Sequence, residues 1–337
     1  MRQQKKWVTM GDVAKRAGVG KITVSRAFRS PEKVHATTLQ KISDAADELG
    51  YVLDETAGAL SSKRTRTVCA VVSTLDQSIF SSTVDGLNDG LSQSGMHLFL
   101  GTAGYNSKTE EALLRTFMGR RPDAVVLTNS LHTDKTKNDL LRSNIPVFEL
   151  WELPDDPIYA AVGFSNFQAG RDITDYLKQK NKRRISFIRI HYQDERRSRL
   201  RMEGYCAAIQ GIHSPRCIEL DYVIGTSAAE FGAQALSRII EKWPDTDAVV
   251  CANDSLALGV WCEAMRRGIS IPHKLALTGF GDFEVAGTAA LGLTTVHIDG
   301  YGMGKATANL IRDYCGGRRD LPEITDIGYR IIERASA

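Results

Sequence analysis

Two short amphipathic segments meet at Gly18 in the stretch Val8-Thr-Met-Gly-Asp-Val-Ala-Lys-Arg-Ala-Gly-Val-Gly-Lys-Ile-Thr-Val-Ser-Arg-Ala-Phe28. Thr9 is a good N-cap residue for a first helix, because its hydroxyl accepts an otherwise unpaired backbone N–H. Gly18 suits the left-handed turn that ends this helix, since glycine has no Cβ to clash there. A second helix is expected over Lys21 to Arg29. The small Ala14 before the turn lets the two helices cross closely, which predicts a helix-turn-helix with its second helix free to enter a DNA major groove.

An ordinary helical hairpin inside a larger helical protein is the alternative interpretation of this stretch. The distribution of charge argues against it. Residues 1–66 hold 13 Lys and Arg against 7 Asp and Glu, whereas the remaining residues hold 30 against 33. A basic module joined to a slightly acidic remainder suits a polyanionic partner such as DNA.

The bulk composition is that of a globular protein, with 337 residues, 42% hydrophobic and 25% charged. No apolar run approaches the ~20 residues that a membrane span needs, so no membrane partner is expected. No apolar segment follows the basic N-terminus, which predicts a cytoplasmic protein rather than an exported one. The six cysteines include no CxxC pair, which fits a reducing compartment and disfavours a metal site.

Beyond the head, apolar β-rich runs alternate with amphipathic helical stretches. A third helix is expected from about Thr37 to Leu49, and a polar linker follows it. The alternation then predicts parallel sheets with helices on both faces. The expected strands cover residues 68–72, 98–100, 124–127, 147–150, 161–164, 185–190, 248–251 and 275–278. We therefore expect an α/β fold with a helix-turn-helix head (1–52), a linker (53–66) and two doubly wound lobes (67–337), with any ligand in the cleft between the lobes.

The chain resembles the LacI family of bacterial transcription regulators nearly from end to end. The matching segments, in order, are residues 8–28 and 45–51 of the head, 57–60 of the linker, and 252–259, 277–280 and 293–296 of the lobes. Within that family, residues 145–150 and 156–166 are similar to the gluconate-utilisation repressors. The resemblance implies lobes of the periplasmic-binding-protein type, a homodimer and a pseudo-palindromic operator in double-stranded DNA, as expected for a two-fold protein.

The resemblance places Lys21 and Ile22 at the start of the recognition helix, facing base edges, with Arg26 one turn further on. Arginine donates two hydrogen bonds to guanine O6 and N7, whereas isoleucine offers only apolar contact to a thymine methyl. A phosphate contact is the alternative for Lys21. Phosphate contacts or local caps are expected for Thr9, Thr23 and Ser25.

The linker resembles the family's hinge helix, which inserts a leucine into the minor groove. Leu60 matches that leucine, and Ala57 matches the small residue that lets two hinge helices approach. Leu53-Asp-Glu55 replaces the family's usual Pro-Asn-Arg, which adds acidic groups near phosphate, and Gly58 weakens the helix. A solvent-exposed linker leucine is the alternative for Leu60.

The effector cleft departs from the sugar-binding members at two positions. Arg201 falls where the family places its sugar-contacting arginine, and Asn253 matches a second polar contact. Gly281 stands after Phe280 where sugar-binding members have an aspartate, and Trp151 stands where some members have another. The cleft therefore lacks the carboxylates that those members have at these two positions.

Arg197 and Arg199 add positive charge beside Arg201. Arginine binds a carboxylate through two parallel hydrogen bonds, so these changes favour an anionic ligand, hypothesised as a sugar acid such as gluconate or a ketogluconate. A neutral sugar or nucleobase effector is the alternative, as is a solvated start of the helix for the extra arginines. Phe80 is a candidate cleft wall or a core residue, and Asp282 a partner of Arg201 or a helix cap.

Nothing in the sequence indicates an enzyme or a cofactor. Residues 300–306 resemble a phosphate loop only faintly, and neither HExxH nor GxSxG occurs. A small-molecule-binding protein without DNA function is the rival class, and the basic head argues against it. No leucine heptad follows the last expected strand, so a tetramer formed by a C-terminal bundle is not expected. Whether the effector releases or promotes DNA binding stays open.

Overall fold

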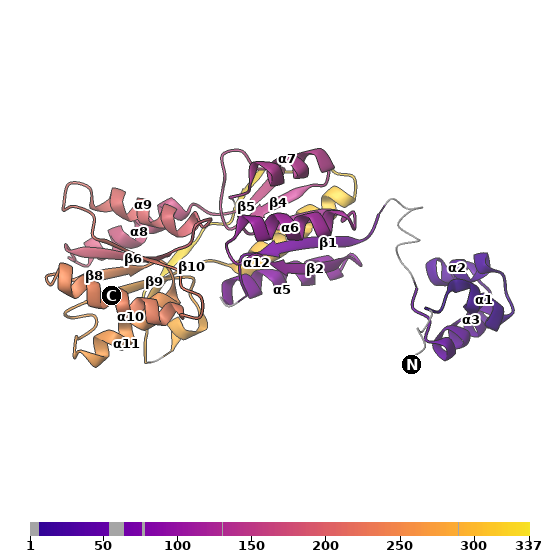
Figure 1. Cartoon of the computed structure of the whole chain (residues 1–337), viewed down its shortest axis with the longest axis horizontal. Coiled ribbons are helices and arrows are strands. Elements are labelled where there is room, and N and C mark those ends of the chain that lie inside the picture. Colours follow the sequence, from indigo (N-terminus) through magenta and orange to yellow (C-terminus); the bar gives the residue numbers. More distant parts are fainter. Residues whose placement is uncertain (1–6, 54–63, 76–77, 130, 289) are drawn as a thin grey trace. The chain divides into compact units, whose positions relative to one another are not determined.

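The structure is a computed structural model that describes residues 7–53, 64–75, 78–129, 131–288 and 290–337 (Figure 1). The chain divides into two units, Met1–Thr65 and Arg66–Ala337. The first unit is the head, and the second contains two lobes. The expected division at residues 52 and 66 stays a prediction, because residues 54–63 lie outside the described part.

Three helices build the head: α1 (Met10–Ala17), α2 (Lys21–Arg29) and α3 (Ala36–Leu49), with a 3-10 turn, η1 (Pro31–Lys33), between the last two. Thr9 caps α1, since its Oγ1 accepts from the N–H of Asp12 while its own N–H donates to the Asp12 carboxylate at 2.9 Å. Gly18 ends α1 with φ 69°, the left-handed conformation predicted for it. The helix-turn-helix is therefore present, with the predicted bounds for α2.

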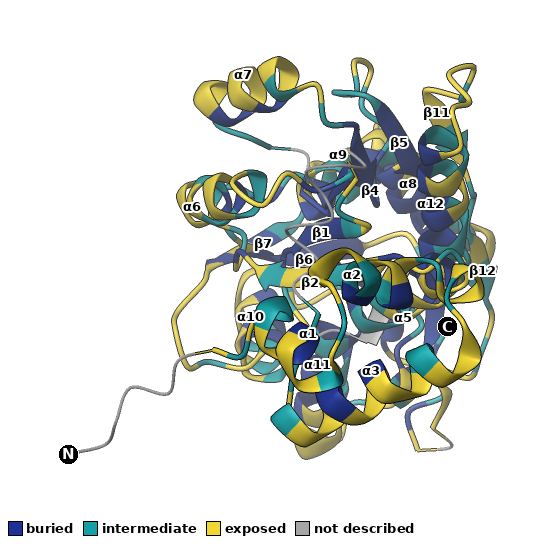
Figure 2. Ribbon diagram, turned by 90° about the vertical axis from the view of Figure 1, so that its right-hand side faces the viewer, coloured by how far each residue is buried: buried dark blue, intermediate teal, exposed yellow. Residues whose placement is uncertain are grey.

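The head encloses its own small core. Its buried residues come from one side of each helix, and the opposite sides are exposed (Figure 2). They are Val13, Ala14, Val24, Ala27, Ile42, Ala45 and Ala46. The small alanines let the three helices approach closely, so that a few side chains suffice to hold the recognition helix.

The first lobe has a parallel six-stranded sheet in the order β11-β5-β4-β3-β1-β2. Its strands are β1 (Thr67–Val72), β2 (His97–Thr102), β3 (Ala124–Leu127), β4 (Val147–Leu150), β5 (Ala160–Gly163) and β11 (Ile324–Asp326). Its helices are α5 (Ser78–Ser92), α6 (Ser107–Met118), α7 (Asp134–Ser143) and α12 (Gly300–Cys315). The helix α7 was not predicted, because its sequence is mostly polar and shows little apolar periodicity.

The second lobe repeats this arrangement with the order β12-β10-β9-β8-β6-β7. Its strands are β6 (Ile185–His191), β7 (Cys217–Asp221), β8 (Ala248–Cys251), β9 (Ala276–Phe280), β10 (Thr294–His297) and the antiparallel β12 (Arg330–Ile332). Its helices are α8 (Asn166–Gln179), α9 (Arg197–Ile209), α10 (Ala228–Lys242), α11 (Asp254–Arg266) and the 3-10 turn η2 (Glu284–Gly287). The α/β fold with a head and two doubly wound lobes is confirmed.

The chain passes between the lobes three times, from β5 to α8, from β10 to α12 and from β11 to β12. The helix α8 packs against α9 through two glycines. A Cβ on Gly204 would lie 2.0 Å from the carbonyl oxygen of Phe167, and one on Gly170 would lie 2.1 Å from that of Arg201. These glycines therefore let α9 pack closely on α8, and this packing determines where the arginines of α9 lie. None of the helices in the described part combines the length and hydropathy needed to span a bilayer.

Candidate DNA-binding surface and ligand cleft

One side of α2 is exposed and basic. Val24 and Ala27 face the core of the head, so the residues on the opposite side of the helix face outward. Lys21, Ile22 and Arg26 are exposed, and Ile22 keeps 76% of its surface accessible. An exposed β-branched residue beside two cations matches a surface that contacts both thymine methyls and polar base edges.

The other predicted DNA contacts lie partly on the head and partly outside the described residues. The Thr9 hydroxyl is used within the head, where Oγ1 donates to Asp12 Oδ2 at 2.7 Å. Thr23 and Ser25 are partly buried on α2. Ala57 and Leu60 lie outside the described residues, so their predicted roles in a hinge stay predictions.

A cavity lies between the two sheets of the second unit, at the carboxyl ends of their strands. Six predicted effector residues line it: Phe80, Trp151, Arg197, Arg201, Asn253 and Phe280. Tyr105, Asn166, Ile190, Tyr192, Glu195, Ser198, Ala252 and Leu256 complete the lining. This position follows the rule that ligands bind beyond the carboxyl ends of parallel strands.

Arg201 is a partly buried cation of the cavity. It donates to the carbonyl oxygen of Ala252 at 3.2 Å and to Asn166 Oδ1, and its guanidinium lies 4.0 Å from the centre of the Phe280 ring. Its buried Nε has no hydrogen-bond partner among the described residues. Burial lowers the pKa of Arg201 to about 10, with Glu195 acting in the opposite direction. The side chain therefore stays charged at neutral pH and keeps one donor free.

Arg197, the first residue of α9, reaches from the second lobe into the first. Its Nη1 donates to the carbonyl oxygen of Thr128 at 2.7 Å, and its Nη2 donates to Ser73 Oγ at 3.2 Å. Ser73 follows β1 and Thr128 follows β3, the two strands between which the strand order reverses. The guanidinium also lies 5.0 Å from the centre of the Phe80 ring. Arg197 thus joins the lobes directly.

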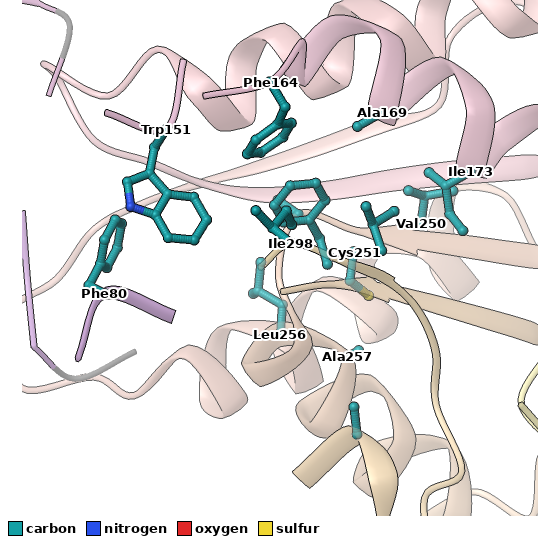
Figure 3. Packing of buried hydrophobic residues seen from close by; sticks show 14 of the residues in the cluster. Phe80, Trp151, Phe164, Ala169, Ile173, Val250, Cys251, Leu256, Ala257 and Ile298 are labelled. Atoms are coloured by element: carbon teal, nitrogen blue, oxygen red, sulfur yellow. The ribbon is translucent and has the colours of Figure 1, made fainter. Parts of the chain in front are cut away.

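Trp151 follows β4 with φ 73°, a conformation that a bulky side chain rarely adopts. Its carbonyl oxygen accepts from Asn166 Nδ2 at 2.9 Å, which holds this turn in place. The indole packs edge-on against Phe80 and Phe164 at 5.3 and 6.2 Å between ring centres (Figure 3). The indole Nε1 is buried and has no hydrogen-bond partner among the described residues. Strain of this kind is concentrated at functional sites.

Asn253 and Phe280 mark the ends of two strands in the second lobe. Asn253 caps α11, where its Oδ1 accepts from the N–H of Leu256 at 2.9 Å. Phe280 ends β9 and packs beneath Arg201. Both side chains therefore have structural contacts of their own in addition to lining the cavity.

Arg199 and Gly281 are not part of the lining. Arg199 is half-exposed, with its Nε 3.7 Å from Glu203 Oε1, because two residues along a helix turn it to the opposite side from Arg197 and Arg201. Gly281 adopts φ 121°, and a Cβ there would lie 2.2 Å from the Phe283 ring, so the turn itself requires glycine.

Asp282 takes neither of the roles considered for it. Its carboxylate accepts from Arg334 Nη2 at 2.7 Å and lies 2.9 Å from His297 Nδ1. It therefore ties the turn after β9 to the end of β10 and to the segment that follows β12, rather than to Arg201.

Sequence reasoning missed Glu195, Tyr105 and Tyr192. The two tyrosines come from different lobes and stack with 4.6 Å between ring centres. Glu195 lies two residues before Arg197, so its nearness to the arginines was visible in the sequence. Its burial was not, because burial depends on tertiary packing around the start of α9.

A helix-turn-helix joined to two lobes around a charged cleft defines the class of transcriptional regulators that carry a small-molecule-binding unit. Residues 9–54 match the family described as bacterial regulatory proteins, lacI family. Residues 65–315 match periplasmic binding proteins and sugar binding domain of LacI family. The chain belongs to the LacI family and is a DNA-binding transcriptional regulator, not an enzyme.

Individual relatives agree with this assignment. The HTH-type transcriptional regulator GntR of Pseudomonas aeruginosa is 30% identical over 331 residues, covering 97% of this chain and 95% of that protein. A LacI-family regulator from Silicibacter pomeroyi has a similar structure, with a TM-score of 0.90, 27% identity and coverage of 98% and 99% of the two chains. The transcription regulator GntR from Chromobacterium violaceum gives a TM-score of 0.73 and 31% identity, covering 80% of this chain and 98% of that one.

Proposed function

We propose that this regulator is a repressor of carbohydrate or sugar-acid catabolism, and that a small anionic sugar acid such as gluconate or a ketogluconate controls it. The observation that carries the effector class is the pair of buried donors, Arg201 Nε and Trp151 Nε1, which have no acceptor within the described part of the chain. A buried donor without an acceptor costs about 1–3 kcal/mol. A ligand rich in carboxylate and hydroxyl oxygens would satisfy both.

The charge of the lining and the relatives support the same class. Arg197 and Arg201 outnumber the one acid, Glu195, among the described lining residues. Homology to GntR-type and IdnR-type regulators suggests gluconate or idonate. A neutral sugar or nucleobase is the alternative effector, and it would leave the cationic excess of the cleft unmatched.

On the DNA side, we place Lys21, Ile22 and Arg26 in the major groove of each half of a pseudo-palindromic operator. A homodimer presents two such heads, so the two-fold symmetry of the protein matches that of the site. Ala57 and Leu60 remain the proposed hinge contacts in the minor groove. Such a protein works in the compartment that holds the chromosome, the bacterial cytoplasm.

A ligand in the cleft affects DNA binding by changing the contact between the two lobes. The cavity has a volume of about 40 Å³, which leaves room for a few waters. A six-carbon acid therefore enters only when Arg197 or the spacing of the lobes changes. To act, an effector must bind one arrangement of the lobes more tightly than the other. A tenfold change in DNA affinity needs a difference of about 1.4 kcal/mol between its binding free energies for the two arrangements.

The first test is calorimetric titration of gluconate and 2-ketogluconate into the full-length protein and into Arg201→Met. We expect micromolar binding to the wild type and at least a hundredfold loss in the variant, because the variant removes this cation and the free Nε donor. Arg199→Met, on the same helix but outside the cavity, is the matched control and should bind like the wild type. Tighter binding of a neutral hexose than of gluconate would contradict the proposed anionic effector.

A further inference from the structure

Three charged side chains line the cavity in the described part of the chain: Glu195, Arg197 and Arg201. Each comes from α9 or the turn just before it, so all the formal charge enters from the second lobe. The first lobe contributes aromatic side chains instead, among them Phe80 and Trp151. The charge of the site is therefore set within one short segment.

Glu195 is held firmly in this segment. It is 8% exposed, and its carboxylate accepts from the N–H of Ser198 at 2.8 and 3.1 Å and from the Ser198 hydroxyl. Its Oε1 also lies 3.8 Å from Arg197 Nε. These contacts cap the start of α9 and prevent the carboxylate from turning to solvent when a ligand arrives.

The charged groups around the cavity are already paired elsewhere. Arg189 donates to Glu219 behind the start of α9, and Arg196 lies 2.9 Å from Glu152. Asp194 Oδ2 accepts from the backbone N–H of Ser107 at 2.9 Å.

Asp254 sits outside the lining. Its two carboxylate oxygens accept from Thr295 Oγ1 and from the N–H of Phe283 at 2.6 and 2.7 Å. The balance that a ligand meets inside the cavity is therefore two guanidiniums against one carboxylate.

We propose that Glu195 is a specificity-determining residue that limits the cleft to one net positive charge, so that the regulator accepts a monoanionic sugar acid and rejects a dianionic one. This inference rests on the proposed function in taking sugar acids as effectors. One ligand carboxylate neutralises the site. A second negative group has no free cation to pair with and meets the Glu195 carboxylate in a buried environment, where an unpaired charge is strongly unfavourable.

The test compares two acids with the same six-carbon chain, gluconate with one carboxylate and glucarate with two. Calorimetry on the full-length protein at neutral pH should give at least a tenfold preference for gluconate. In Glu195→Gln that preference should fall at least tenfold, because the amide keeps an acceptor for Ser198 but removes the negative charge. If Glu195 has a purely structural role, the variant will bind both acids more weakly by the same factor, and the ratio of their dissociation constants will not change. That result would overturn the proposal.

Glu203→Gln is the matched control. It removes the same charge from the same helix at a half-exposed site that pairs with Arg199, so the ratio of the two acids should remain that of the wild type. An equal change of the ratio in both variants would show a general field effect and would overturn the proposal.

A second measurement separates this proposal from the identity of the effector. If gluconate and glucarate both fail to bind the wild type, the proposed effector is wrong, and the inorganic pair nitrate and sulfate still probes the charge of the cleft. Thermal melting should then show that Glu195→Gln gains more stabilisation from sulfate, relative to nitrate, than Glu203→Gln does. Equal gains in the two variants would refute the role of Glu195.

Discussion

In the head, Lys21, Ile22 and Arg26 stand on one nine-residue helix, and the buried residues of that same helix decide which way they face. In the cleft, the side chains that meet come from segments between residues 80 and 280, and Arg197 finds its partners Ser73 and Thr128 on the other lobe. The head is thus defined by local structure and the cleft by tertiary structure. A substitution should therefore disable one of them and leave the other intact.

The largest effect is expected from Val24→Asp, which places a charge in the small core of the head. Val24 is fully buried, and an unpaired buried charge costs several kcal/mol, about 4 or more in a core of this size. The head should unfold and DNA binding should be lost. Calorimetric melting should still show the transition of the lobes near its wild-type temperature, and a shift of that transition would mean that the units depend on one another.

The converse substitution, Gly204→Val, acts on the cleft alone. The added Cβ would lie 2.0 Å from the carbonyl oxygen of Phe167, so α8 and α9 must separate, at a cost of about 3 kcal/mol. Urea unfolding followed by circular dichroism should show less stable lobes. Amide signals of the head in NMR spectra should stay in place, whereas their movement would argue against separate units.

A smaller effect on stability is expected from His132→Gln. His132 lies buried between Glu110 and Glu149 in the first lobe, away from the residues that line the cavity. Burial lowers its pKa, but the hydrogen bond to Glu110 and the attraction of the Glu149 carboxylate, 3.5 Å from Nε2, outweigh burial and raise the pKa to about 9 from 6.5. Because the folded-state pKa is raised, the stabilisation is fully present below pH 6.5 and is lost as the pH rises through 9.

Urea unfolding at several pH values can measure this contribution. The stability gap between wild type and His132→Gln should narrow by about 1–3 kcal/mol between pH 6.5 and pH 10. A gap that stays constant over this range would show that the imidazolium does not stabilise the lobe. DNA binding by the head should be unaffected at pH values where the lobes remain folded.

The same contrast explains what could be predicted from the sequence. The bounds of α2 and of β3, β4 and β8 were predicted correctly, since capping residues and apolar runs mark them locally. The strands β11 and β12 have three residues each and exist only because a partner strand pairs with them, so no local pattern predicts them.

The candidate site was predicted in part for a related reason. Helical spacing alone would have grouped Arg197 with Arg201, four residues apart, and set Arg199 aside. The predicted cluster of three arginines therefore includes one, Arg199, that faces solvent. The partners of Arg197 and the burial of Glu195 depend on how two sheets meet, which no single segment encodes.

The two lobes repeat one strand order, β2-β1-β3-β4-β5-β11 in one and β7-β6-β8-β9-β10-β12 in the other. The cavity lies where the reversal points of the two lobes face each other. Both lobes supply aromatic rings, yet among the described lining residues the charged side chains come from the second lobe. Backbone pseudo-symmetry combined with chemical asymmetry gives the cavity a direction, so a molecule with unlike ends fits it in one orientation.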